Sequence, residues 1–159
     1  MVDVSAKPAT RRRALAEGFV HLAPATLRLL RAGRIAKGDA YAVARLAGIQ
    51  AGKRTSEWIP LCHPVRLDEL RVDLAPAGPG RVRITAEAVA VDRTGVEMEA
   101  LVAVAAAGLA LYDMIKAVDR SAALEGVRLL EKEGGRSGRW VRGPLAKKAA
   151  KQPGTRRSS

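Results

Sequence analysis

The chain has 159 residues, the size of one ordinary domain, and 28 lysines and arginines against 16 acidic residues give it a formal net charge of +12. Its single cysteine, Cys62, excludes a disulfide within the chain, and a zinc site would have only Cys62, His21 and His63 to draw on where about four ligands are usual. No apolar run approaches the ~20 residues that cross a bilayer, and the N-terminus lacks the apolar segment of a secretory signal. We therefore expect a soluble cytoplasmic protein with no metal site and no membrane contact.

The positive charge is unevenly distributed. The last segment, 143–159, has no acidic residue and combines proline, glycine and serine with five basic residues, namely Lys147, Lys148, Lys151, Arg156 and Arg157. Such a composition favours a disordered basic tail at 143–159 after a domain at 1–142. Only five aromatic residues occur, and they are not interleaved with the basic ones as in single-strand binders. A nucleic-acid partner is therefore not expected, although the net charge keeps it as an alternative.

The first half of the chain predicts a strand and two helices. Residues 17–22 resemble a short strand, and Pro24 starts a helix that runs to Gly33. Asp39 is a suitable N-cap for a second helix through Lys53. The apolar positions of that helix follow the spacing of a core stripe and are Ala40, Val43, Ala44 and Ala47.

The second half predicts a hairpin, a long helix and a returning strand. Apolar and charged residues alternate over 69–74, and a turn at 76–80 leads into a second strand at 81–91. Residues 96–118 are apolar almost all the way round, which predicts a buried helix. A last strand is expected near 126–131. This order indicates an α+β fold with helices packed on one face of a mainly antiparallel sheet.

Four segments carry polar residues that packing alone does not require. They are Lys37-Gly38-Asp39, the proline-flanked Cys62-His63, the acids Glu97 and Glu99 with the Asp113/Lys116 pair on the long helix, and Lys132 with the glycine-rich 134–138. Each also has a purely structural interpretation as a rigid turn, a helix-dipole arrangement or a flexible loop. Neither nucleotide-binding glycine fingerprint is present. These residues by themselves indicate a cationic site for a small phosphorylated molecule.

Seven segments in order resemble the molybdenum cofactor biosynthesis protein C family, the cyclic pyranopterin monophosphate synthases. The segments are 1–7, 37–39, 47–55, 59–64, 94–101, 112–118 and 134–138, and the resemblance extends to about residue 141. It implies a ferredoxin-like subunit in a homo-hexamer built as a trimer of dimers. It also implies conversion of 3′,8-cyclo-7,8-dihydro-GTP, supplied by a radical SAM GTP cyclase, to cyclic pyranopterin monophosphate with release of pyrophosphate. No cofactor is implied, and a requirement for a divalent cation such as Mg²⁺ stays open.

The same resemblance assigns the site residues. Asp113, Lys116 and Lys37 fall on catalytic positions, with the lysines in acid/base steps and Asp113 orienting Lys116. The positions implied to face the guanine-derived rings are Leu61, Cys62, His63, Met98 and Glu99, and those for the triphosphate are Lys53, Arg12 and Lys132. Glu97 is also implied to bind the substrate. Arg136 stands where the family usually has lysine. A pterin- or nucleotide-binding assembly protein without turnover is a further alternative.

Overall fold

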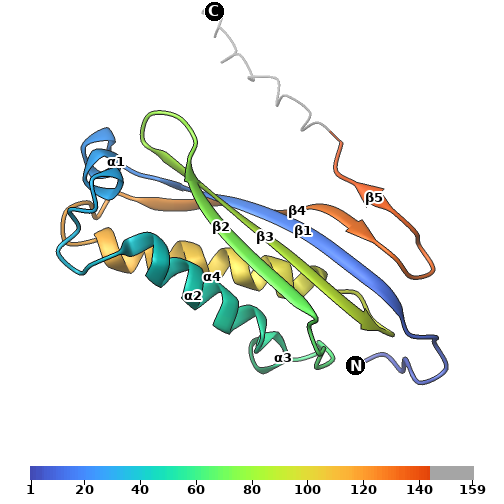
Figure 1. Ribbon diagram of the computed structural model, residues 1–159. Coiled ribbons are helices and arrows are strands. Elements are labelled where there is room, and N and C mark those ends of the chain that lie inside the picture. The colour runs from blue at the N-terminus through green and yellow to red at the C-terminus, as the bar shows by residue number, and fades with distance from the viewer. Residues whose placement is uncertain (144–159) are drawn as a thin grey trace, which may run out of the picture.

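The computed structural model describes residues 1–143 and contains a five-stranded sheet in the order β2-β3-β1-β4-β5, in which all neighbours are antiparallel (Figure 1). The strands are β1 (Thr10–His21), β2 (Glu69–Pro76), β3 (Arg81–Asp92), β4 (Ala123–Glu133) and β5 (Trp140–Val141). From residue 144 onward, the predicted basic tail lies outside the described residues.

The helices are α1 (Pro24–Arg31), α2 (Ala40–Gly52), α3 (Thr55–Trp58) and α4 (Glu97–Ile115). Helix α4 packs against β1, β3 and β4, and α2 packs against α4 and β2, so both cover the same face of the sheet (Figure 1). The order of the first four strands and the helices between them is that of a ferredoxin-like fold. The predicted α+β class, with helices on one face of an antiparallel sheet, is confirmed.

Helix α4 is the central core element. Eleven of its residues are buried, and by length and composition it could cross a membrane. Its apolar side chains instead pack against the sheet and α2, as in the core helix of a soluble protein. It ends at Ile115 rather than at Val118, so Lys116 is its C-cap.

Small residues let α2 approach α4 closely. A Cβ atom on Gly48 would lie 2.8 Å from the carbonyl oxygen of Ala103, so only glycine fits there. The predicted stripe on α2 was partly wrong, because Val43 is 44% exposed and Ala47 is only partly buried. The buried residues of α2 are instead alanines and glycines, namely Ala40, Ala44, Gly48, Ala51 and Gly52.

Strand β1 is about twice as long as predicted, because its basic first half is also paired. Ala14 and Ala16 point into the core, whereas Arg13 lies on the opposite face and forms ion pairs with Glu87, Glu131 and Glu133. Strand β4 likewise extends beyond 126–131, and the short α3 and β5 were not predicted.

The face of the sheet away from the helices holds one buried carboxylate. Glu17 is 5% exposed, and its two carboxylate oxygens accept hydrogen bonds from Arg83 and Arg128 on the neighbouring strands. This network is far along β1 from the N-terminal end of α4.

Candidate active site

A first cavity, of about 250 Å³, opens at the N-terminal end of α4. It is formed by the loop after α3, the turn after β3 and the first turn of α4, and its lining residues are Leu61, Cys62, His63, Thr94, Gly95, Glu97, Met98 and Glu99. The five residues assigned to the guanine-derived rings and Glu97, also assigned to substrate binding, therefore lie together. They come from one loop, 61–63, and one helix end, 97–99, which are more than thirty positions apart in the sequence.

Burial shifts the titration of two groups in this cavity. Glu99 is 4% exposed, and its removal from water raises the pKa of its carboxyl to about 7. Desolvation, with a smaller contribution from the negative charge of Glu99, raises the pKa of the Cys62 thiol. Near neutral pH the cavity thus offers a carboxyl group that is able to donate or accept a hydrogen bond, beside an uncharged thiol.

A second cavity, of about 370 Å³, adjoins the first and is strongly cationic. The two cavities share Thr94, Gly95 and Glu97. The basic residues that line the second cavity are Lys7, Arg12, Arg93, Lys132 and Arg136, and Ser137 completes its lining. Five cations against the single carboxylate of Glu97 leave a local excess of positive charge that suits a polyphosphate.

The guanidinium of Arg12 is held by backbone groups. Its Nε donates to the carbonyl oxygen of Asp92 and its Nη2 to that of Arg93, both at 3.2 Å. The glycine-rich loop closes over it: Gly135 has φ 71°, and a Cβ atom there would lie 1.7 Å from Nη1 of Arg12. Gly135 therefore lets the loop pass directly over the side chain of Arg12.

Lys132 is anchored from the same loop. Its Nζ donates to Oγ of Ser137 at 2.5 Å and lies 3.6 Å from a carboxylate oxygen of Glu97. This pair connects β4 to the first turn of α4 at the boundary between the two cavities. Arg12 and Lys132, which the sequence assigned to the triphosphate, are thus brought together, whereas Lys53 is exposed at the C-cap of α2 and lines neither cavity.

A separate cluster lies at the C-terminal end of α4. Asp113 pairs with two lysines: Nζ of Lys37 is 2.7 Å from Oδ2, and Nζ of Lys116 is 2.7 Å from Oδ1. Nζ of Lys37 also donates to the backbone carbonyl of Asp113 at 2.9 Å. The three residues assigned to catalysis therefore form one cluster.

The ion pairs set the charges of this cluster. Hydrogen bonds from Lys116 and Lys37 lower the pKa of Asp113 to about 2, and the Asp113 carboxylate in turn raises the pKa of Lys116. Lys116 is therefore protonated at neutral pH before substrate arrives. That state suits a proton donor or a cationic partner for developing negative charge.

The Lys37–Asp113–Lys116 cluster and the two cavities lie at opposite ends of α4. Met98 and Lys116 are 18 positions apart, and at ~1.5 Å per residue this corresponds to about 27 Å along the helix axis. A single chain does not bring them together. Each half of the predicted site is assembled within the chain, but the whole site is not.

Arg136 lies in the glycine-rich segment already singled out for phosphate binding, whereas two other residues of the cationic cavity, Lys7 and Arg93, were not assigned to the site from the sequence. The register between β1 and β3 explains the place of Arg93, since Thr10 pairs with Asp92 and brings Arg12 beside Arg93. Recognising that the basic segment 10–13 belongs to β1 would have revealed Arg93 as its neighbour.

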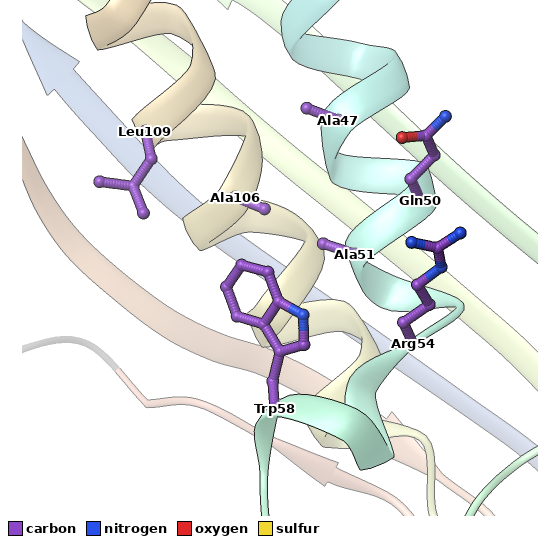
Figure 2. Close-up of a pocket in the computed structure, with 7 residues that line it drawn as sticks. All are labelled: Ala47, Gln50, Ala51, Arg54, Trp58, Ala106 and Leu109. Atoms are coloured by element: carbon purple, nitrogen blue, oxygen red, sulfur yellow. The ribbon is translucent and has the colours of Figure 1, made fainter.

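A third hollow, of about 260 Å³, lies on the outer face of the helices. Figure 2 shows Trp58 of α3 between Leu109 and Ala106 on α4 and a row of residues on α2. Trp58 and Leu109 are both more than half exposed, as is Leu46 of α2. This outer helix face carries large apolar side chains that residues 1–143 do not cover.

Known proteins are similar to this chain over most of its length. The model of the MoaC family matches residues 1–135. A cyclic pyranopterin monophosphate synthase of Methylobacterium sp. (strain 4-46) is 57% identical over 146 residues, which is 91% of each chain. The proteins of the same name from Thermomicrobium roseum (strain ATCC 27502 / DSM 5159 / P-2) and, as synthase 1, Mycobacterium tuberculosis (strain CDC 1551 / Oshkosh) are 56% and 55% identical. They match 89% and 87% of this chain and 86% and 81% of their own length. On this evidence the chain belongs to the MoaC family.

Proposed function

We propose that the chain is a cyclic pyranopterin monophosphate synthase of molybdenum cofactor biosynthesis. It would convert 3′,8-cyclo-7,8-dihydro-GTP to cyclic pyranopterin monophosphate and release pyrophosphate. The observation that carries this proposal, beside the names of the relatives, is the pair of adjoining cavities at the N-terminal end of α4. One offers ring-sized space with a carboxyl, an imidazole and a thiol, and the other offers five cations.

The two cavities suit the two parts of a nucleotide triphosphate. The guanine-derived rings carry hydrogen-bond donors and acceptors, for which Glu99 and His63 are suitable partners in the first cavity. The triphosphate would lie against Arg12, Lys132 and their basic neighbours in the second. Charge at this position also stabilises pyrophosphate as it leaves.

The chemistry needs proton transfers at two stages. The ring rearrangement breaks and forms bonds at the base, and each step moves a proton. Formation of the cyclic monophosphate requires a hydroxyl oxygen of the substrate to attack the α-phosphorus, which breaks the bond to the β-phosphate and releases the hydroxyl proton. Lys116, held protonated by Asp113, is assigned to proton donation, and Lys37 acts with it.

The proposed active unit is a homo-hexamer, a trimer of dimers, in which one site combines residues of two chains. The separation of about 27 Å between Met98 and Lys116 exceeds the length of a compactly bound nucleotide. A site that uses both ends of α4 must therefore take them from different chains. The exposed Trp58 and Leu109 on the outer helix face support self-association, because a second copy would remove them from water. Leu46 of α2 is a further exposed apolar side chain.

No redox cofactor enters the proposed reaction, since the substrate is rearranged without net oxidation. The proposal includes no resident cofactor, and a requirement for a divalent cation such as Mg²⁺ stays open. We place the reaction in the cytoplasm, where the radical SAM cyclase that supplies the substrate would work.

The decisive experiment is incubation of the protein with the cyclised nucleotide made by that cyclase. The proposal expects cyclic pyranopterin monophosphate and pyrophosphate in equal amounts. Saturable binding without either product would favour the pterin- or nucleotide-binding alternative. Binding of DNA with an affinity that falls steeply with salt, and no turnover, would favour the nucleic-acid alternative.

A further inference from the structure

Asp119 lies where two separate segments of the catalytic cluster meet. It follows α4, whose end carries Asp113 and Lys116, and it is 7% exposed. Its backbone N–H donates to the carbonyl of Ile115 at 2.9 Å, so it continues the last turn of α4. The side chain thus belongs to the segment that bears two of the three catalytic residues.

The carboxylate of Asp119 reaches across to the start of α1. Its Oδ2 accepts hydrogen bonds from the backbone N–H of Ala23 at 2.7 Å and from Oγ1 of the buried Thr26 at 3.1 Å. Ala23 is the N-cap residue of α1, and its methyl side chain cannot accept a hydrogen bond. Asp119 therefore caps a helix to which it does not belong, with its negative charge at the favourable end of the helix dipole.

The remaining carboxylate oxygen is satisfied locally. Oδ1 accepts hydrogen bonds from the backbone N–H of Ser121 at 3.1 Å and from its Oγ at 2.7 Å. One oxygen thus binds α1 and the other binds the loop after α4. The carboxylate is a link between two segments rather than a cap within one.

Helix α1 leads directly to Lys37. Leu27 and Leu30 of α1 and Ile35 of the following loop are buried in the core. Backbone hydrogen bonds continue through this loop, and the last of them joins the N–H of Gly38 to the carbonyl of Ile35 at 2.9 Å. The position of α1 therefore sets the position of the Lys37 backbone.

The contacts among the catalytic side chains are too weak to fix this arrangement themselves. The side chains of Lys37, Asp113 and Lys116 are 43%, 54% and 51% exposed. Ion pairs between exposed groups contribute little to stability and are screened by salt. A buried carboxylate that accepts four hydrogen bonds gives a much firmer connection.

We infer that Asp119 is a positioning residue of this active site, which holds the α1–Lys37 segment against the Asp113–Lys116 end of α4. The inference rests on the proposed function, because it assumes that these three residues carry the chemistry. Asp119 itself touches Ala23, Thr26 and Ser121 and not the reacting atoms. Its effect on the reaction is therefore through the placement of Lys37.

The first test is Asp119→Asn in the full chain. The amide keeps the size of the side chain but replaces one acceptor oxygen by a donor, so it cannot accept all four bonds. We expect kcat to fall by about 10- to 100-fold, the scale of a misplaced catalytic group, with KM changed by less than about threefold, since the substrate cavities lie at the other end of α4. Rates are normalised to folded protein well below the melting temperature.

Glu17→Gln is the matched control. Glu17 is also a buried carboxylate that accepts hydrogen bonds from other strands, but it lies on the opposite face of the sheet. It should lower the melting temperature and leave kcat unchanged. If Asp119→Asn keeps a normal kcat, or if Glu17→Gln lowers kcat equally, the inference is wrong.

A pair of hydroxyl variants separates the link to α1 from the local bond. Thr26→Val removes a bond that crosses to α1, and Ser121→Ala removes one within the segment after α4. Thr26→Val should lower kcat severalfold. Thr26→Ser keeps the hydroxyl and should have a kcat near the wild-type value, and Ser121→Ala should leave kcat nearly unchanged. Equal effects of Thr26→Val and Ser121→Ala would overturn the inference.

Hydrogen exchange supplies a readout that does not depend on turnover. Asp119→Asn should increase amide exchange at residues 23–27 and 33–38, while Glu17→Gln should not. If the wild-type protein shows no turnover, the proposed function fails, and this comparison still decides whether Asp119 holds the Lys37 loop. Unchanged exchange at 33–38 in Asp119→Asn would show that it does not.

Discussion

Lys37 and Asp113 are 76 positions apart in the sequence, yet Nζ of Lys37 donates to both the carboxylate and the backbone carbonyl of Asp113, at 2.7 and 2.9 Å. The contact joins the loop after α1 to the last turns of α4. Because the Asp113 carboxylate also pairs with Lys116, the two lysine ammonium groups lie beside one carboxylate. This convergence is the basis of the first prediction.

Lys37→Ala and Lys116→Ala should each lower kcat by at least ~10²-fold, the usual scale for removing a general acid or base. The fold and the assembly should persist, because both side chains are exposed. Steady-state kinetics and size-exclusion chromatography check the two parts. Arg71→Ala, an exposed change on the edge strand β2, is the control and should keep normal turnover. A lysine variant with near-normal kcat would remove that lysine from the mechanism.

Mixed oligomers test whether one site uses two chains. Glu99→Ala and Lys116→Ala should each be inactive alone. Co-refolded in equal amounts, they should recover about one quarter of the wild-type activity, because random assembly gives one site in four an intact copy of each end. Mass spectrometry should verify mixing. If verified mixed oligomers are as inactive as the parents, the shared site is wrong.

The buried Glu99 predicts a pH-dependent stability. Its folded pKa of about 7 lies above the ordinary value of 4.5, so the folded state binds the proton more tightly than the unfolded state. Stability should therefore fall as pH rises from about 4.5 to about 7, by at most about 3 kcal/mol from this group. Glu99→Gln should lose this dependence.

Denaturant unfolding of wild type and Glu99→Gln at pH 5 and pH 8, at equal protein concentration, measures the effect. The gain of the glutamine variant over wild type should be larger at pH 8. A gain that is equal at both values would mean that the carboxyl titrates normally in the folded protein.

Removing a basic side chain from the cationic cavity should lower the affinity of the protein for polyphosphate. Arg93→Ala and Lys132→Ala should each raise the KM for the cyclised nucleotide and the inhibition constant for pyrophosphate by about 10- to 100-fold, the value of a hydrogen bond to a charged group. Arg66→Ala, an exposed change outside this cavity, is a matched loss of charge. Inhibition by pyrophosphate that is unchanged in both cavity variants would place the triphosphate elsewhere.

Removal of residues 145–159 should leave kcat and KM within a factor of a few of the wild-type values. The five basic residues that line the cationic cavity all belong to residues 1–143. The measurement is a comparison of the truncated and full chains at two salt concentrations. A large rise in KM after truncation would show that the basic tail helps to capture the substrate.

The fold was largely predictable because its hairpin and long helix have clear periodicity. Residues 69–92 alternate as a half-buried hairpin does, and 97–115 are apolar throughout. The first half of β1 was not predictable in this way, since a run of three arginines, Arg11 to Arg13, is typical of a solvated surface unless its partners on β3 and β4 are known. The prediction that Val43 lies in the core was wrong for a related reason, because hydrophobicity alone does not show which apolar face of a helix packs against the rest of the domain.

The site was predictable as residues and in part as an arrangement. Sequence resemblance identified the segments of both clusters, and the apolar pattern over 96–118 indicated one long helix, which at ~1.5 Å per residue already separates Met98 from Lys116. The contact between the two cavities was not predictable, because it depends on the pairing of β1 with β3. The role of Lys53 stays a prediction, because its exposed position at the end of α2 leaves it outside the cavities of its own chain.

The loop that passes over Arg12 limits which residues around the cationic cavity can be substituted. The carbonyl groups that hold this guanidinium belong to the backbone at Asp92 and Arg93, so side-chain changes at those two positions leave the acceptors in place. Gly135 is less tolerant, because its φ of 71° disfavours any other residue and a Cβ atom there would push the guanidinium aside. A substitution of this glycine, which carries no functional group, should therefore lower substrate affinity through the displacement of Arg12.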